Sequence, residues 1–443
     1  MAIVQTPPVA AGPRTSRDTG IDFLRALCVL GVVLLHAIMV GVTVGDSGPV
    51  FENASDDTAW IAPLSWLLQV MPLFFVIGGF SGFLAHQRMR QRGGTAVGFV
   101  AGRVHRLLRP AILTIAVVGL ALALLTIFGV PADLIATAGF RYGQPLWFLG
   151  VFLLCQALLP LFAAAHQRAP LWTIGALAAA AIVIDVLRGA SGIEGLGFLN
   201  LAFVWMTLQQ LGFFLADGRI ERLSRRIRIA AGLAAVFALL MTFVVGVYSP
   251  DLIANINPPT AALLLVGVAH TSLLSLHRER LERFSRQPRV AAFTAFVTVR
   301  TMTIYLWHMP VLLLMAGSTA AFALLTGAAL PALDSAAWWT GRPLWLATAL
   351  SLTAVVAVAF TRFETQAAPA STSSLGRIVT SALSALAGIV LLLVLGTSVA
   401  TALIALALIA GSLRLATVPT PRSAGKRPSP VPVAPVPVTP VLA

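Results

Sequence analysis

The sequence predicts an all-α protein, a polytopic bundle of transmembrane helices. Only 10% of the 443 residues are charged, 58% are hydrophobic, and the mean hydropathy is +0.91. A soluble domain has about 25% charged residues, so this chain has too little polar surface to cover itself in water. Its apolar residues form continuous runs, and in lipid only helices or closed barrels satisfy the backbone. The composition excludes a water-soluble enzyme, a disordered chain and a collagen-like fibre.

Ten apolar runs are each long enough to cross a bilayer, which takes about 20 helical residues. The first run is expected to remain as a helix, because residues 1–19 lack the apolar core of a signal peptide. A last stretch over 378–413 is too long for one ordinary span and short for two. It is either one long tilted helix or a hairpin broken near 396–398. The ten core spans are 22–44, 61–85, 111–130, 145–165, 171–187, 195–216, 229–248, 259–276, 301–326 and 340–361.

These spans divide the chain into four parts. Residues 1–19 are expected to form a disordered cytoplasmic N-terminus, and 20–365 a membrane domain with ten core spans. Residues 366–417 add one or two C-terminal transmembrane segments, and 418–443 form a Pro-rich, disordered tail. The two cysteines, Cys28 and Cys155, lie within apolar runs, where a thiol acts as a small hydrophobe.

Arginine placement predicts the orientation in the membrane. The formal net charge of +14 comes almost entirely from arginine, concentrated in segments 86–109, 217–228 and 277–300, and the loops between them carry mainly acids. Cytoplasmic loops are enriched in basic residues, so we expect a multi-pass protein of a bacterial cytoplasmic membrane with a cytoplasmic N-terminus. The arginines punctuate apolar runs and do not gather on a polar surface, so no nucleic-acid partner is expected.

Ionisable residues inside lipid are costly, so each one is a candidate functional residue. Arg25 and His36 stand eleven positions apart on the first span, which places them about 20° from alignment on one helix face and roughly 16 Å apart along it. Either Arg25 is an interfacial anchor and His36 a hydrogen-bonding core residue, or both belong to a site. The candidates singled out in or beside the runs are Asp22, Arg25, His36, His270, Arg300 and His308. Expected in solvated loops are His86, His105, His166 and His277.

A neutral imidazole in a bundle interior suits the general base of an acyl transfer, because it accepts a proton from a hydroxyl near neutral pH. His36 therefore predicts this chemistry. The sequence contains no Gly-x-Ser-x-Gly, no Cys-x-x-Cys and no His-Glu-x-x-His pattern that competes with it. No metal site is expected.

The segment from Gly20 to Leu27, running on to His36, resembles the opening helix of the acyltransferase family 3 membrane proteins, which is marked by an Arg-x10-His spacing. The resemblance covers about residues 20–365. It departs at Gly78, where the family commonly has the serine of Ser-Gly-Phe, with Ser81 nearby. Four further motifs follow in the family's order: 71–80, the Arg-x-x-Arg segment 103–110, the Trp-Phe-Leu segment 146–149 and the Tyr-x-x-His-x-Pro segment 304–310.

The resemblance implies an enzyme that moves an acyl group, often acetyl, from acyl-CoA to a hydroxyl of a carbohydrate, a lipid-linked sugar or a small molecule. His36 is the candidate that activates the acceptor hydroxyl or relays the acyl group. Arg25 is the candidate that orients the CoA end or stabilises the thioester oxyanion. The resemblance therefore implies acyl-CoA as the donor substrate, with acetyl-CoA the first candidate. No tightly bound cofactor is expected. The remaining partners are membrane lipid and the hydroxyl-bearing acceptor.

An arginine triplet supplies the candidate donor-binding group. Arg103, Arg106 and Arg109 precede an expected span, and guanidinium groups match phosphate geometry. Such arginines are also ordinary topology anchors, so both interpretations stay open for each residue. Further cavity candidates are Tyr305, His308 and Asp22.

Two other classes of protein fit the same features. A secondary transporter or exporter of envelope precursors or drugs also has many spans and a few buried charges. Transporters often contain repeated halves, and this sequence has no convincing internal repeat. A non-catalytic partner in envelope assembly is the third possibility, and it requires that His36 tolerate substitution.

Overall fold

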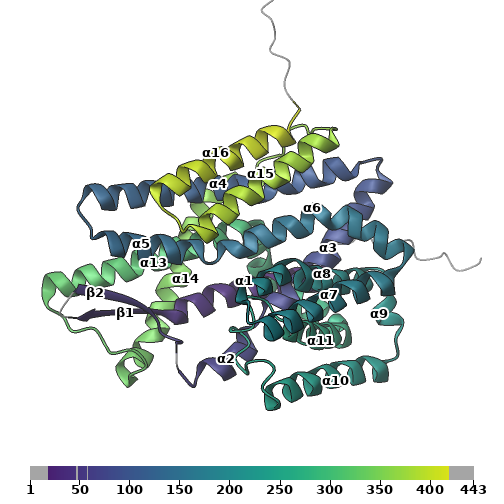
Figure 1. Cartoon of the computed structure of the whole chain (residues 1–443), viewed down its shortest axis with the longest axis horizontal. Helices are drawn as coiled ribbons and strands as arrows, with labels where there is room; N and C mark the ends of the chain where they lie inside the picture. Colours follow the sequence, from purple (N-terminus) through teal and green to yellow (C-terminus); the bar gives the residue numbers. More distant parts are fainter. Residues whose placement is uncertain (1–17, 46–47, 57, 419–443) are drawn as a thin grey trace, which may run out of the picture.

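The computed structural model describes residues 18–45, 48–56 and 58–418, and it confirms the predicted all-α polytopic bundle (Figure 1). Eleven helical segments in this described part are long and apolar enough to cross a membrane. The predicted disordered ends of the chain fall almost entirely in 1–17 and 419–443, outside the described residues.

The elements follow one another in this order: α1 (Thr19–Met39), β1 (Val40–Gly45), β2 (Gly48–Asn53), α2 (Ile61–Leu68), α3 (Met71–Gln91), α4 (Ala96–Ile127), α5 (Ala132–Gly143), α6 (Leu146–Arg168), α7 (Pro170–Ser191), η1 (Glu194–Leu199), α8 (Asn200–Ala216), α9 (Arg219–Arg222), α10 (Arg225–Val244), α11 (Ala262–Ser285), α12 (Pro288–Val299), α13 (Thr301–Thr326), α14 (Ala336–Thr365), α15 (Leu375–Val394) and α16 (Val399–Ala416).

The first expected span, 22–44, extends beyond the C-terminal end of the observed helix. Helix α1 stops at Met39, and β1 and β2 form an antiparallel ribbon in which Val42 pairs with Phe51. Val40, Val42 and Val44 are β-branched residues that favour strands. Hydropathy alone does not separate an apolar helix from an apolar strand, so the boundary was placed five residues late.

Helix α4 begins earlier than the expected span 111–130 and takes in the arginine triplet. Its N-cap is Thr95, whose side chain accepts a hydrogen bond from the Gly98 amide. Arginine is a good helix former, so the helix continues out of the apolar zone through Arg103, Arg106 and Arg109. The expectation that these arginines lie in a loop before the helix is therefore wrong.

The expected span 61–85 is two helices, α2 and α3, separated at Gln69 and Val70. Pro72 lies in the first turn of α3; proline has no N–H and clashes with the preceding turn, so it fits a helix start and not a helix interior. The same segment approaches α1 closely, because a Cβ added to Gly31 would lie 3.1 Å from the Val70 side chain.

Helices α3 and α8 pack backbone to backbone. A Cβ at Gly79 would lie 2.1 Å from the Gln209 carbonyl oxygen, and one at Gly212 would lie 2.1 Å from that of Val76. Small residues allow such close contact between transmembrane helices. Gly78 is less constrained, since its Cβ would lie 3.1 Å from the Phe152 ring.

The stretch 378–413 is a hairpin and not one tilted helix. Helix α15 packs on α6, and α16 packs on α4 (Figure 1). The turn contains Gly396 at φ 73°, which favours glycine, and Ser398 and Thr401 form a capping box that starts α16. The expected break near 396–398 is thus the correct alternative.

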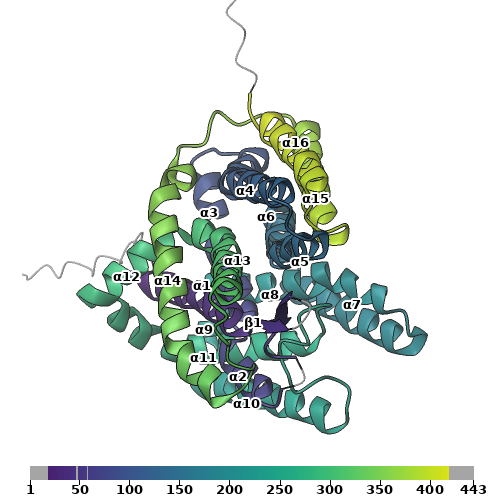
Figure 2. The same cartoon turned by 90° about the vertical axis from the view of Figure 1, so that its left-hand side faces the viewer.

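The expected span 259–276 corresponds to α11, which is not among the eleven apolar segments. Its second half carries several charged side chains: Arg278, Glu279, Arg280, Glu282 and Arg283. Helix α14 runs along one side of the bundle and contacts both α1 and α13 (Figure 2). Helix α1 carries His36 and α13 carries His308.

Candidate functional site

Two cavities lie along α1, one at each of its candidate residues. The arginine cavity, of about 1190 Å³, is lined by Arg25. The histidine cavity, of about 260 Å³, is lined by His36. Further lining residues of the arginine cavity are Asp22, Arg88, Arg103, Arg106, Arg109, Arg278 and Glu364. Helical periodicity aligned Arg25 and His36 on one face of α1, and the structure gives them separate cavities.

Arg25 is held by two side chains at the wall of the arginine cavity. Its guanidinium donates to Asp22 Oδ1 at 2.7 Å and to Ser81 Oγ at 2.6 Å. Asp22 lies in the first turn of α1, where a carboxylate interacts favourably with the helix dipole. Ser81 lies on α3, three residues after Gly78, the position where this chain departs from the family's Ser-Gly-Phe motif.

The three arginines of α4 are spaced by three residues and line the same cavity, but they are engaged to different degrees. Arg106 is exposed, and the guanidinium of Arg103 lies 4.9 Å from the centre of the Phe99 ring. Arg109 donates to the backbone carbonyls of Gln366 and Ala367 at 3.2 and 2.9 Å. Arg109 therefore fixes the segment that follows α14, and Arg103 and Arg106 are better placed to bind an added anion.

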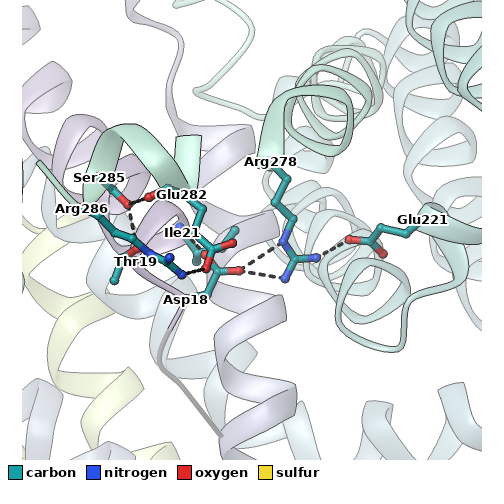
Figure 3. A network of polar contacts seen from close by, with 8 residues as sticks. All are labelled: Asp18, Thr19, Ile21, Glu221, Arg278, Glu282, Ser285 and Arg286. Atoms are coloured by element: carbon teal, nitrogen blue, oxygen red, sulfur yellow. Dashed lines mark hydrogen bonds and ion pairs between the residues drawn. The ribbon is translucent and has the colours of Figure 1, made fainter. Parts of the chain in front are cut away.

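Another arginine of the arginine cavity, Arg278, joins three elements (Figure 3). It donates to Asp18 Oδ2 at 2.8 Å and to Glu221, which connects α11 with the start of α1 and with α9. Asp18 also caps α1 by accepting from the Ile21 amide at 3.0 Å. The sequence analysis did not group Asp18, Glu221 and Arg278, because these three residues lie far apart along the chain.

His36 presents a defined tautomer to the histidine cavity. Its Nδ1 lies 2.8 Å from the carbonyl oxygen of Val32. A carbonyl only accepts, so Nδ1 carries the proton and Nε2 is left as an acceptor. The half-buried ring lines the cavity. It is therefore arranged to take a proton at Nε2.

His308 lies behind His36 and lines neither cavity. It is fully buried, and the two imidazole rings meet edge to face with centroids 4.9 Å apart. His308 Nδ1 donates to the Tyr305 carbonyl at 2.5 Å, and Nε2 has no partner among the described residues. Tyr305 does line the histidine cavity, and its hydroxyl donates to the Pro145 carbonyl at 2.7 Å.

Helix α14 fixes the end of α1 that carries His36. The Arg342 guanidinium donates to the Val40 carbonyl, and the Trp345 indole donates to that of Ala37, both at 2.9 Å. Arg342 is 8% exposed and lies 3.7 Å from the Trp338 ring centre. A cation is stabilised at a helix C-terminus. Sequence reasoning missed this buried arginine, although its spacing from the two tryptophans places all three on one helical side.

A half-buried carboxylate on α7, Asp185, holds the loop between α10 and α11, which contributes Ile256 and Asn257 to the histidine cavity. Asp185 accepts from the Tyr248 hydroxyl and from the Ala261 amide, each at 2.7 Å. Burial and this carboxylate raise the pKa of Tyr248, so the phenol stays protonated as the donor. Asp185 was also missed, because one acid in an alanine-rich run gives no hint of its partners.

The four histidines expected in solvated loops all lie in helices. Two of them are deeply buried, because His105 is 3% exposed and His166 is 1% exposed. His166 bonds Gln210 Oε1 at 3.0 Å and Asp217 Oδ2 at 3.1 Å, which is a structural contact between α6 and the end of α8. In the described ranges no cluster of three or more His, Cys, Asp or Glu side chains is arranged to hold a metal ion.

The two cavities meet at a shared wall. Phe74, Thr301 and Met302 line both of them. The arginine cavity and the cavity that holds the base are therefore adjacent. This arrangement suits group transfer from a long phosphorylated donor.

Comparison with known protein families gives a match over most of the chain. A family model described as an acyltransferase domain matches residues 18–362, which is most of the chain. No curated protein and no solved structure matches it.

Proposed function

This chain belongs to the acyltransferase family 3 of membrane proteins, and from that premise we propose that it is an O-acyltransferase of the cell envelope. The donor is acyl-CoA, with acetyl-CoA the first candidate. The acceptor is a hydroxyl of a carbohydrate, a lipid-linked molecule or a small molecule. The membership supports acyl transfer, and the donor and acceptor are inferred from the chemistry of the cavities.

The observation that carries this proposal is the shared wall between an arginine-lined cavity and one that holds a base. A CoA molecule has phosphates at one end and its thioester at the other. Arg103 and Arg106 suit the phosphates, because charge-assisted bonds from guanidinium to phosphate are strong. Arg25 lies roughly 16 Å from His36 along α1, so its role is at the CoA end and not at the reacting carbonyl.

His36 acts as the general base in this mechanism. Its Nε2 takes the proton of the acceptor hydroxyl as the oxygen attacks the thioester carbonyl carbon. The tetrahedral intermediate collapses with cleavage of the C–S bond, and the leaving thiolate takes the proton back from His36. The bond between Nδ1 and the Val32 carbonyl keeps the ring in the tautomer that accepts at Nε2.

The same proposal includes an orientation. Positive residues favour the cytoplasmic side, so the arginine cavity faces the cytoplasm, where acyl-CoA is made, and the N-terminus is cytoplasmic. The acceptor enters from the opposite end of the histidine cavity, lined by Glu52 and Gln144. The membrane is the cytoplasmic membrane of a bacterium.

A CoA-release assay tests the function. The full chain in nanodiscs receives acetyl-CoA and a panel of hydroxyl acceptors, and a thiol reagent reports released CoA. The chain's own two cysteines are both buried, which keeps the background low. We expect acceptor-dependent release in the wild type and its loss in His36→Ala and Arg25→Ala.

Two matched variants control for nonspecific damage. His277→Ala and Arg168→Ala remove the same residue types at positions that line neither cavity, and we expect both to keep activity. Wild-type release by a correctly folded His36→Ala variant contradicts the mechanism. Movement of the acceptor across the membrane without consumption of donor indicates the transporter instead.

A further inference from the structure

The boundary between the two cavities falls at one level on four helices. On α1, Arg25 lines the arginine cavity and Val29, one turn on, lines the histidine cavity. On α6 the boundary lies between Phe152 and Phe148. On α3 and α13 the residues at this level, Phe74 and the pair Thr301 and Met302, line both cavities. We call Phe74 and Met302 the partition.

The partition is apolar and largely buried. The Phe74 ring lies edge to face against Phe148 and Phe152, with centroids 5.1 and 5.8 Å away. Phe148 and Phe152 stack on each other at 5.4 Å. Phe74 is 8% exposed and Met302 is 5% exposed. Aromatic rings held from several sides resist displacement, because close-packed interiors respond poorly to added volume.

The reacting end of the donor has to pass this level. Val29, the first α1 residue beyond the boundary, stands seven positions before His36, which is about 10 Å of helix. A thioester at His36 therefore requires that the acyl group, followed by part of the linear pantetheine arm, lie through the partition while the phosphates stay in the arginine cavity.

We propose that Phe74 and Met302 select the acyl group by its width. This inference rests on the proposed function, since it takes acyl-CoA as the donor. A straight acyl chain is no wider than the pantetheine arm that follows it, so it passes wherever the arm passes. A chain branched near its carbonyl is wider and meets the Phe74 ring. The partition thus favours linear acyl groups over branched isomers of equal volume.

Association rates of a pair of isomers test the width rule. Wild-type chain in nanodiscs is mixed with radiolabelled pentanoyl-CoA or with radiolabelled 3-methylbutanoyl-CoA, and the bound label is followed over time. We expect the linear isomer to associate about tenfold faster than the branched one, as a misfitted methyl group costs in a tight site. In Phe74→Ala the ratio of the two rates falls below about threefold, and the equilibrium displacement of bound label by free CoA is unchanged.

A matched control separates the partition from general loosening of the core. Phe83→Ala makes the same change on the same helix at a side chain that is 1% exposed and lines neither cavity. We expect it to keep the wild-type isomer ratio. If Phe74→Ala fails to fold, Phe74→Leu and Met302→Ala are the milder substitutions to use. We expect each to give an isomer ratio between those of the wild type and Phe74→Ala.

The outcomes distinguish the two proposals. If the wild type binds no CoA compound at all, the proposed donor is wrong. If it binds acyl-CoA but does not distinguish the isomers, the donor stands and the width rule is wrong. An isomer ratio that persists in the folded Phe74 and Met302 variants also overturns the rule.

Discussion

The arginine cavity and the histidine cavity differ in size, in charge and in how their polar groups are engaged. The first has about 1190 Å³ and is lined by basic side chains, several already paired, as Arg25 is with Asp22. The second has about 260 Å³, and its His36 keeps Nε2 as an acceptor. A nearby positive charge opposes protonation of an imidazole. In the mechanism that we propose, separating the cavities lets one chain bind an anion and still offer a neutral base.

The difference between the two cavities predicts that substitutions in them impair different properties, kcat in the histidine cavity and donor binding in the arginine cavity. In His36→Ala we expect kcat to fall by roughly 10²–10⁴-fold, the range for loss of a general base, with acetyl-CoA binding unchanged. The measurement is CoA release together with equilibrium binding of radiolabelled acetyl-CoA. Loss of binding in the folded variant would mean that His36 belongs to the donor site.

A smaller effect is expected at the arginine cavity. Arg106→Ala removes an exposed guanidinium, and we expect the KM for acetyl-CoA to rise about tenfold, as one charged hydrogen bond is worth roughly 1.5–3 kcal/mol. Arg109→Ala is the matched comparison, with a smaller rise in KM, because Arg109 already binds two backbone carbonyls. Initial rates against acetyl-CoA concentration give both values, and equal effects would contradict the assignment.

The smallest effect is expected for substitutions of His308, which packs against His36. His308 touches His36 but lines neither cavity, so we expect it to act as a positioning residue. An aromatic pair contributes roughly 0.5–1.5 kcal/mol, so His308→Ala should lower kcat by about fivefold and leave KM unchanged. His308→Phe keeps a ring against His36 and should recover most of the rate. A change in KM, or no recovery by Phe, would contradict positioning.

Much of the fold was predictable because its signals are local. The span expected at 301–326 coincides with α13, since a continuous apolar run between polar ends specifies a transmembrane helix by itself. The predictions failed where the boundary depends on something other than hydropathy. The arginines of α4 extend a helix through polar sequence, and the valines after Met39 turn an apolar run into a strand.

The candidate site was predictable only in part, for a related reason. The common helix face of Arg25 and His36 follows from the sequence, because it depends on helical periodicity alone. Arg342 and Asp185 were missed because their partners, Val40 and Tyr248, lie far away along the chain. The catalytic and binding roles themselves stay predictions until they are measured.

The sequence by itself determined that this protein spans a membrane many times, since scarce charge and long apolar runs leave no other way to satisfy the backbone. It also determined that Arg25 and His36 lie on one face of the first span. Only the tertiary structure decided that Arg25 and His36 face two cavities, and that Phe74 and Met302 stand between them. A cavity is the space left between helices, so its shape depends on how distant segments pack, which no local pattern specifies.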